Sequence, residues 1–594
     1  FFAVKEKQDP TLIMISATTV PTMAPTIRLI PGLPDHSEQA ILLDPYSPQA
    51  KANKWMLDDP NWQTYQPDRL LQRFALATFY YATTVTLDEN GTATTTVSHW
   101  INDLNWLSYS HHECDWFSKP EASWGEHKLT SDSPCNANGV YERIWLAGNG
   151  LVGFLSEELY ELSWLTSMDI QSNGGLGGSI ASHIGTLSNL QHFAGPTSKS
   201  FGGALPTELG LLSSLLTMQL TFTRVSGAVP SQMGRLNKLE RLRMAFNELS
   251  GPLPTELGLM TSLREIDLIV NQLSGPIPPE MARLYEKMMY FRLSDNMLTG
   301  SIPHELGSFA TVYEFRLSDN MLTGTVPTNL GRMKELRELD VTKNSLTGAI
   351  PSQIGVWKHL FGLYLGDNLF TEIPSQIGLM TSLTSSWLND NPLTAIPSEL
   401  GLLTDQTELD LGRTKTQLIP TEFGLLTNLV LLDLSYNGIR SLPILQEGEF
   451  SALASLDLSG NAFNESTFPT GLWSLSSLVY VYLDELFGSD EDEIVRFPTE
   501  VGYLTNLEVL WSSNAGWDGS LPSEIGLLHQ LASLRMDGND FTGSLPMEWE
   551  SLVAPSGSIL KLSLVNNSLL SGTVPPALCV MEEDMLRFDC SEYL

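Results

Sequence analysis

Four arginines in this sequence have the chemistry and the spacing to bind an anionic group. Arg292 and Arg316 hold the same place in two copies of the decapeptide FRLSDNMLTG, which begin at Phe291 and Phe315. A guanidinium is a planar fork of donors that fits a carboxylate or a sulfate in a bidentate way. The alternative is that the two copies reflect only the duplication of one unit. The predicted ligand contacts of this kind are Arg241, Arg243, Arg292 and Arg316.

Aromatic and acidic residues occupy the equivalent place in other units. Exposed rings are typical of interaction hot spots and of platforms on which sugars stack, although they could also merely cover a sheet. The aromatic candidates are Tyr364, Trp387, Tyr482 and Trp511. Three aspartates about 5 Å apart on neighbouring strands could hold Ca²⁺, which binds six to eight oxygens; otherwise no cofactor is predicted. These aspartates are Asp410, Asp433 and Asp457.

Signatures of catalysis are missing from the sequence. It has no Walker loop, no G-x-S-x-G elbow, no protein-kinase signature and no pair of carboxylates set apart for acid–base work. His111, His112 and Cys114 in HHECDW are a weak indication of a metal site, because no second ligand cluster follows at a suitable spacing. The sequence therefore predicts a protein that is not an enzyme.

An internal repeat must position the candidate side chains. Units such as ERLRMAFNELSGPLPTELGLMTSL recur about 18 times from Glu142 onward, with the pattern L-x-L-x-x-N-x-L-x-G-x-I-P-x-x-L-G-x-L-x-x-L. The alternation in x-L-x-L-x predicts a short inner strand, G-x-I-P predicts an outer extended segment, and the tail predicts a helical turn. Stacked units build a solenoid whose inner sheet exposes the arginine, aromatic and aspartate positions.

An asparagine follows the inner strand in 13 of the units. A buried amide at this point can satisfy backbone groups of neighbouring coils, so we expect a structural role rather than a ligand contact. The residues are Asn149, Asn173, Asn247, Asn271, Asn296, Asn320, Asn344, Asn368, Asn391, Asn437, Asn461, Asn539 and Asn567.

Two irregularities interrupt the repeats, which span residues 142–575. Between about 368 and 498 the glycine of G-x-I-P is missing, which predicts a weaker outer sheet and a local change of curvature. A longer unit carries an acidic insertion at about 484–496, which is either a solvated loop or a contact for calcium or a basic partner. The acidic residues of its loop are Asp490, Glu491, Asp492 and Glu493.

Composition limits the partners. The chain has 33 lysines and arginines against 68 aspartates and glutamates, a net charge of -35, so nucleic acid would be repelled. No run reaches the roughly 18 apolar residues of a membrane span. The chain begins FFAVKEKQ without an initiator methionine, which leaves open an upstream signal peptide or membrane anchor.

The two ends differ from the repeats. Residues 1–34 are rich in threonine and proline and predict a linker or stalk, residues 35–141 show helical spacing, and residues 576–594 close the chain. All four cysteines lie at the ends and predict two disulfides, Cys114 with Cys135 and Cys579 with Cys590, and an oxidising compartment. Glycosylation sequons at Asn90, Asn464 and Asn566 fit secretion.

The repeat resembles the leucine-rich-repeat (LRR) family, in the plant-type subclass of receptor ectodomains and secreted inhibitors. The segments SPQAKANKWMLDDP and QRFALATFYYAT are similar to the secreted or membrane-linked LRR proteins of diatoms. The resemblance implies an α/β solenoid, a right-handed superhelix with a parallel inner sheet, a short outer sheet, a helical N-terminal cap and a disulfide C-terminal cap. Cys135 departs from the family, whose second cap cysteine usually follows G-V directly. In this family L-D-L-S is a common inner strand, which favours a structural role for the three aspartates.

The same resemblance implies an extracellular protein, secreted or at the cell surface, that recognises a protein, peptide or glycan through its concave face. The alternative is a structural element of a cell covering, in which the solenoid is a rod that associates with copies of itself. Ice binding, known in some plant-type LRR proteins, would require a flat regular array of threonine or asparagine, and the exposed residues are too irregular for it.

Overall fold

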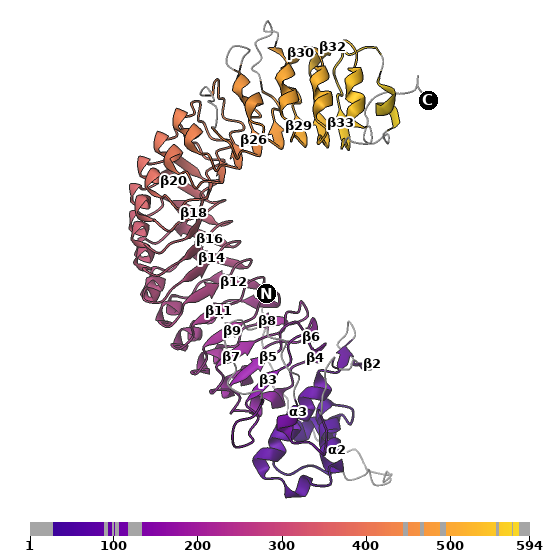
Figure 1. The fold of residues 1–594 in the computed structure, drawn as a ribbon. Coiled ribbons are helices and arrows are strands. Elements are labelled where there is room, and N and C mark those ends of the chain that lie inside the picture. The colour runs from indigo at the N-terminus through magenta and orange to yellow at the C-terminus, as the bar shows by residue number, and fades with distance from the viewer. Residues whose placement is uncertain are drawn as a thin grey trace, which may run out of the picture.

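The computed structural model forms one long arc, with helices at its N-terminal end and a solenoid beyond them (Figure 1). Several predicted features fall outside the residues whose side chains it describes: the acidic loop at 490–493, the sequons at Asn90 and Asn464, and the pair Cys579 and Cys590. The described residues are 28–87, 93–97, 100, 106–116, 133–442, 449–463, 468–486, 495–553, 558–572 and 574–580.

Three helices form the predicted N-terminal cap. The second begins with a favourable cap, because Ser47 Oγ accepts a hydrogen bond from the Ala50 N–H and proline follows at the first helical position. The packed cap starts earlier than the predicted linker boundary at residue 34, since Ile30 is fully buried and its N–H donates to Asn53 Oδ1. The elements are α1 (Asp35–Leu43), α2 (Pro48–Asp58), α3 (Pro67–Ala82), β1 (Val85–Leu87) and β2 (Ala93–Val97).

A disulfide between Cys114 and Cys135 closes the cap just before the first repeat, as the sequence predicts. The two Cα atoms lie 5.4 Å apart, a distance that suits a disulfide. The departure of Cys135 from the family spacing therefore does not prevent the pairing. Of the three sequons, Asn566 lies on described residues and its side chain is exposed.

Eighteen parallel strands of the described residues form the inner sheet, which confirms the predicted solenoid of about 18 repeats. Neighbouring strands pair in phase, so that Phe291 lies beside Phe315 and Arg292 beside Arg316. The strands are β3 (Arg143–Trp145), β5 (Ser167–Asp169), β7 (His192–Ala194), β9 (Thr217–Gln219), β11 (Arg241–Arg243), β13 (Glu265–Asp267), β15 (Tyr290–Arg292), β17 (Glu314–Arg316), β19 (Glu338–Asp340), β21 (Gly362–Tyr364), β23 (Ser385–Trp387), β24 (Glu408–Asp410), β25 (Leu431–Asp433), β26 (Ser455–Asp457), β27 (Tyr480–Tyr482), β29 (Val509–Trp511), β31 (Ser533–Arg535) and β33 (Lys561–Ser563).

The asparagines after the inner strands form a buried ladder that ties the coils together. Asn320 is typical: its Nδ2 donates to the carbonyl oxygens of Leu293, Leu317 and Ser318, and its Oδ1 accepts from the Leu298 N–H. One amide thus satisfies backbone groups in two coils, which confirms the predicted structural role.

At two of the positions where the asparagine is replaced, a threonine hydroxyl makes part of its contacts. Thr223 and Thr414 each donate to the asparagine of the next coil, Asn247 and Asn437 respectively. The repeat pattern alone does not reveal this substitution, because threonine is equally at home on an exposed turn.

The outer sheet depends on a glycine. The glycine of G-x-I-P lies in the left-handed region, with φ of +74° at Gly275 and +77° at Gly300. Within the described residues no outer strand forms between β22 and β28, the stretch that lacks this glycine, so the predicted weakening is confirmed. The outer strands are β4 (Val152–Phe154), β6 (Gly175–Gly177), β8 (Gly202–Ala204), β10 (Arg224–Gly227), β12 (Glu248–Pro252), β14 (Gln272–Pro276), β16 (Met297–Ser301), β18 (Met321–Gly324), β20 (Ser345–Ala349), β22 (Leu369–Glu372), β28 (Val495–Arg496), β30 (Trp517–Ser520) and β32 (Asp540–Thr542).

A second glycine, in the tail L-G-x-L, lets the 3-10 turns on the convex side pack closely. Gly258 lies in one such turn, Thr255–Leu259. A Cβ at Gly258 would lie 2.2 Å from the carbonyl oxygen of Glu280 in the next coil, closer than any real contact. The two coils would have to move apart to admit it.

We therefore expect Gly258→Ala to lower the free energy of unfolding by about 2–3 kcal/mol, the cost of overpacking a rigid contact. The measurement is urea denaturation followed by circular dichroism. Gly174→Ala is the matched control, because a Cβ there meets nothing within 4 Å. Equal destabilisation by the two substitutions would contradict the packing role of Gly258.

Candidate functional site

The inner sheet lines the concave side of the arc (Figure 1). Each inner strand from β21 to β29 contributes the last residue of its span, and the register of the pairs brings these residues side by side in one continuous row. We call this set the concave row; it consists of Tyr364, Trp387, Asp410, Asp433, Asp457, Tyr482 and Trp511.

The arginines that precede the concave row are paired with glutamates. Arg243 donates from Nε and Nη2 to the two carboxylate oxygens of Glu265, at 2.8 and 2.7 Å. Arg292 donates to Glu314 at 2.8 Å and to Glu265 at 3.3 Å. These ion pairs join side chains of adjacent strands.

Arg316 extends this ladder. It donates to Glu338 at 2.9 Å and forms an ion pair with Glu314 at 3.4 Å. Arg241 lies at the start of β11, partly buried. The predicted role of the arginines in ligand binding stays a prediction, and a ligand would have to compete with the glutamates.

The glutamates of this ladder were not among the sequence candidates. Glu265, Glu314 and Glu338 are the first residues of their strands, two positions before the column of last residues to which Arg292 and Arg316 belong. Both columns point to the same side of the sheet because side chains alternate along a strand. The acidic first column was therefore a usable signal for the pairing.

The first aromatic pair of the concave row is well defined. Tyr364 and Trp387 meet edge to face with ring centroids 4.8 Å apart, and Trp387 is 45% exposed. Gly362 makes room for this arrangement, since a Cβ there would lie 2.8 Å from the tyrosine ring. A large exposed ring held by a neighbour is ready to receive a ligand with little loss of side-chain entropy.

Three strands separate the second aromatic pair from the first. Tyr482 and Trp511 also meet edge to face, with centroids 5.2 Å apart. The Trp511 indole N–H donates to Ser533 Oγ at 3.1 Å, and the Arg535 guanidinium lies over the indole, 4.8 Å from its centre. These contacts fix the orientation of the tryptophan.

Three stacked carboxylates separate the two aromatic pairs. In Asp410, Asp433 and Asp457, Oδ1 accepts a hydrogen bond from the backbone N–H two residues later, at 2.9, 2.8 and 2.8 Å respectively. In the part of the chain that the structure describes, no lysine or arginine forms an ion pair with any of the three. The centre of the row is therefore negative and uncompensated.

Burial and mutual repulsion perturb this cluster. Burial, reinforced by the charge of Asp433, raises the pKa of Asp410 to about 7. Burial and the same neighbour raise the pKa of Asp457 to about 6. Both shifts mean that the folded protein holds these carboxylates at an energetic cost when they are ionised.

This cost gives a pH-dependent prediction. Between about pH 4 and pH 7 the folded state binds more protons at Asp410 and Asp457 than the unfolded state, so their contribution to stability falls as pH rises. Asp433→Asn removes the central charge and should raise the free energy of unfolding by about 1 kcal/mol at pH 8. The gain in the free energy of unfolding should be much smaller at pH 5. A gain that urea titrations show to be independent of pH would argue against repulsion among the three aspartates.

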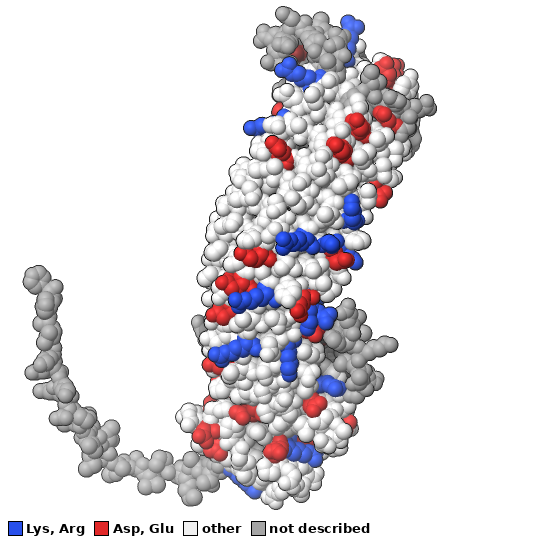
Figure 2. Space-filling view, turned by 90° about the vertical axis from the view of Figure 1, so that its left-hand side faces the viewer, with Lys and Arg blue, Asp and Glu red and all other residues white. Residues whose placement is uncertain are grey.

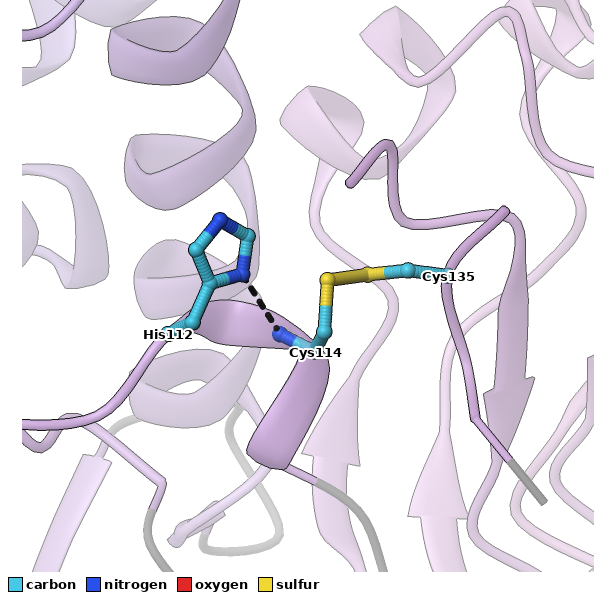
Figure 3. A group of neighbouring side chains, drawn as sticks. All are labelled: His112, Cys114 and Cys135. Carbon is cyan, nitrogen blue, oxygen red and sulfur yellow. Dashed lines mark hydrogen bonds between the residues drawn. A yellow bond between two sulfur atoms is a disulfide. The ribbon is translucent and has the colours of Figure 1, made fainter. Parts of the chain in front are cut away.

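A calcium ion at these three carboxylates stays a prediction. They could supply three of the six to eight oxygens that the ion prefers. The sequence offered a second metal candidate, His111 with His112 and Cys114. The structure instead groups His112 and Cys114 with Cys135, and all three are engaged in other bonds (Figure 3). The two sulfurs form the disulfide, and His112 Nδ1 accepts a hydrogen bond from the Cys114 N–H at 3.2 Å. With its thiols oxidised, this group lacks the thiolate ligands of a zinc site.

The opposite side of the arc has a different character. Figure 2, which looks at the outer side, shows a largely uncharged surface on which lysines and arginines alternate with aspartates and glutamates. Charges of mixed sign produce no extended electrostatic field that would attract a charged partner.

None of the helices in the described part of the chain is long and apolar enough to cross a membrane.

Comparison with known proteins links this architecture to plant receptor ectodomains. No protein-family model matches the chain. No curated protein matches it either. The plant peptide hormone receptor RGFR1, solved in complex with RGF2, is similar to it at a TM-score of 0.64 and 29% identity, over 74% of this chain and 72% of that one.

Two further ectodomains share the fold. The LRR ectodomain of the membrane receptor kinase GASSHO1/SCHENGEN3 from Arabidopsis thaliana, in complex with CASPARIAN STRIP INTEGRITY FACTOR 2, matches at a TM-score of 0.59 and 28% identity, over 75% of this chain and 55% of that one. The ectodomain of the Arabidopsis receptor kinase HAESA, bound to an IDA peptide hormone, matches at a TM-score of 0.56 and 25% identity, over 75% of this chain and 82% of that one. The fold is that of a leucine-rich-repeat solenoid.

Proposed function

We propose that this protein is an extracellular, non-catalytic recognition protein that binds a peptide or a protein segment along the concave row. The observation that carries the proposal is the row itself: two aromatic pairs, held by their neighbours, on either side of three carboxylates without a cationic partner among the described residues. Exposed aromatic anchors beside unpaired charge are what a recognition surface requires.

The row specifies the chemistry of its ligand. A lysine or arginine side chain would neutralise the aspartates, and apolar or aromatic side chains would pack on the rings at either end. Trp387 and Tyr482 are four strand intervals apart, about 19 Å at 4.8 Å per interval. An extended peptide of about six residues covers that length, so we infer a short segment with a basic centre and apolar flanks.

Independent features support an extracellular peptide-binding role. Three of the similar ectodomains were solved with RGF2, with CASPARIAN STRIP INTEGRITY FACTOR 2 and with an IDA peptide hormone. The disulfide in the cap is typical of proteins from an oxidising compartment. The narrower resemblance to the diatom group rests on sequence alone and stays a prediction.

The experiment that tests the proposal is selection from a random 12-residue peptide display library on the immobilised protein at 150 mM NaCl. Enriched peptides should share a lysine or arginine within three residues of an aromatic or aliphatic side chain. The same selection on a variant with Asp410, Asp433 and Asp457 all replaced by asparagine should lose the basic residue.

Other outcomes would overturn the proposal. They are the absence of enrichment above an uncoated surface, enrichment of acidic peptides, or binding on a glycan array in place of peptide binding. The rod alternative predicts concentration-dependent assembly in sedimentation velocity, whereas a recognition protein should sediment as a single species across the same concentrations.

A further inference from the structure

An apolar stripe runs along one edge of the arc, where the inner strands turn toward the outer sheet. Three consecutive coils each contribute one side chain at the same backbone position, and their exposed fractions lie between 36% and 51%. The two phenylalanine rings at its start stack with centroids 4.2 Å apart and planes within 9°. The stripe consists of Phe222, Phe246 and Val270.

The backbone gives no reason for bulky side chains in this stripe. Phe222, Phe246 and Val270 lie in the left-handed region, with φ of 56°, 58° and 53°. Bulky and β-branched residues are strained there, whereas aspartate and asparagine adopt it more readily. Several other coils place short polar residues at this point, such as Asp295 and Asn514. These bulky side chains are therefore present although the local backbone conformation disfavours them.

An acidic series continues the same backbone position beyond the stripe. It comprises Asp295, Asp319, Asp367 and Asp390, with Lys343 between them. Lys343 pairs with Asp319 at 3.2 Å. Burial and the neighbouring charge of Asp319 raise the pKa of Asp295, while burial and Asp390 raise that of Asp367. The series thus keeps carboxylates that repel one another.

We propose that the apolar stripe and the acidic series dock one amphipathic, basic helix of a second protein. A helix rises 5.4 Å per turn, close to the strand spacing of about 4.8 Å, so one apolar side chain per turn meets one coil of the stripe. An extended strand repeats each face only every 6–7 Å and matches the coils poorly. The turns of the docked helix that face the acidic series must carry lysines or arginines for the charges to be complementary, which excludes an acidic helix.

This docking surface is separate from the concave row. The stripe lies on the turns after the inner strands, whereas the concave row lies on the strands themselves. A partner helix at the edge would leave the row open to a peptide. The inference therefore does not depend on the proposed function, and each can fail without the other.

The first test uses a synthetic 21-residue helical peptide with leucines at helical spacing over three turns and lysines on the same face over the next three. Its binding is measured by fluorescence anisotropy at 150 mM NaCl. The double variant Phe246→Asn/Val270→Asn should bind at least 10-fold more weakly, while its Tm stays equal or rises because asparagine tolerates the left-handed backbone. The matched control is Phe361→Asn, an exposed phenylalanine elsewhere on the solenoid.

A charge swap provides the second test. The variant Asp295→Lys/Asp367→Lys should lose the lysine peptide at least 10-fold and gain a peptide in which glutamates replace the lysines. Three results would overturn the proposal: unchanged binding in both double variants, loss of the lysine peptide in Trp387→Ala, or a lower Tm with full binding in Phe246→Asn/Val270→Asn.

Discussion

Asn320→Ala is expected to lower the free energy of unfolding by about 4 kcal/mol. The amide donates to three carbonyl oxygens and accepts from the Leu298 N–H, so the substitution removes four buried hydrogen bonds between and within coils. A hydrogen bond contributes about 0.5–1.5 kcal/mol net, and alanine supplies none of the four. Urea denaturation followed by circular dichroism gives the value.

The control for this effect is an exposed asparagine that lies outside the ladder. Asn428 is exposed and its Nδ2 donates only to the Thr404 carbonyl oxygen. Asn428→Ala should cost about 0.5–1 kcal/mol, the net value of one hydrogen bond. If the two variants unfold at the same urea concentration, the ladder does not hold the coils together.

Trp387→Ala/Trp511→Ala is expected to weaken binding of the selected basic peptides at least 100-fold. Each tryptophan carries a large exposed or partly exposed ring that its neighbours hold in place, and such residues dominate binding energies. A 100-fold loss corresponds to about 2.7 kcal/mol of binding free energy. Isothermal titration calorimetry at 150 mM NaCl measures it.

A matched aromatic on the convex side controls for non-specific effects. Tyr503 lies in a 3-10 turn and is 70% exposed, so Tyr503→Ala should leave the affinity within about 2-fold. Peptide affinity that survives loss of both tryptophans would move the binding site away from the concave row.

Sequence predicted most of this fold because each repeat poses the same packing problem. The inward residues Phe291 and Phe315, the ladder asparagines and the outer glycines all appear where the alternation and the period placed them. The close approach at Gly258 could not be predicted, since it depends on the distance between turns 22 residues apart in the chain.

The candidate site was predicted only in part. The aromatic and aspartate positions follow from strand alternation, and the structure aligns them in one row. The pairing of Arg292 with Glu265 and Glu314 did not follow, because it joins two columns across three strands. A sequence alone does not show whether a charged residue pairs with another residue of the protein or with a bound partner.

A crystal structure of the protein with its tightest selected peptide would show whether the concave row is the binding site. The peptide is expected to cross the inner strands from β21 to β29, with a basic side chain within about 4 Å of Asp433 and apolar side chains on Trp387 and Tyr482. A peptide bound on the convex side or along the edge of the solenoid, with the concave row empty, would contradict this expectation.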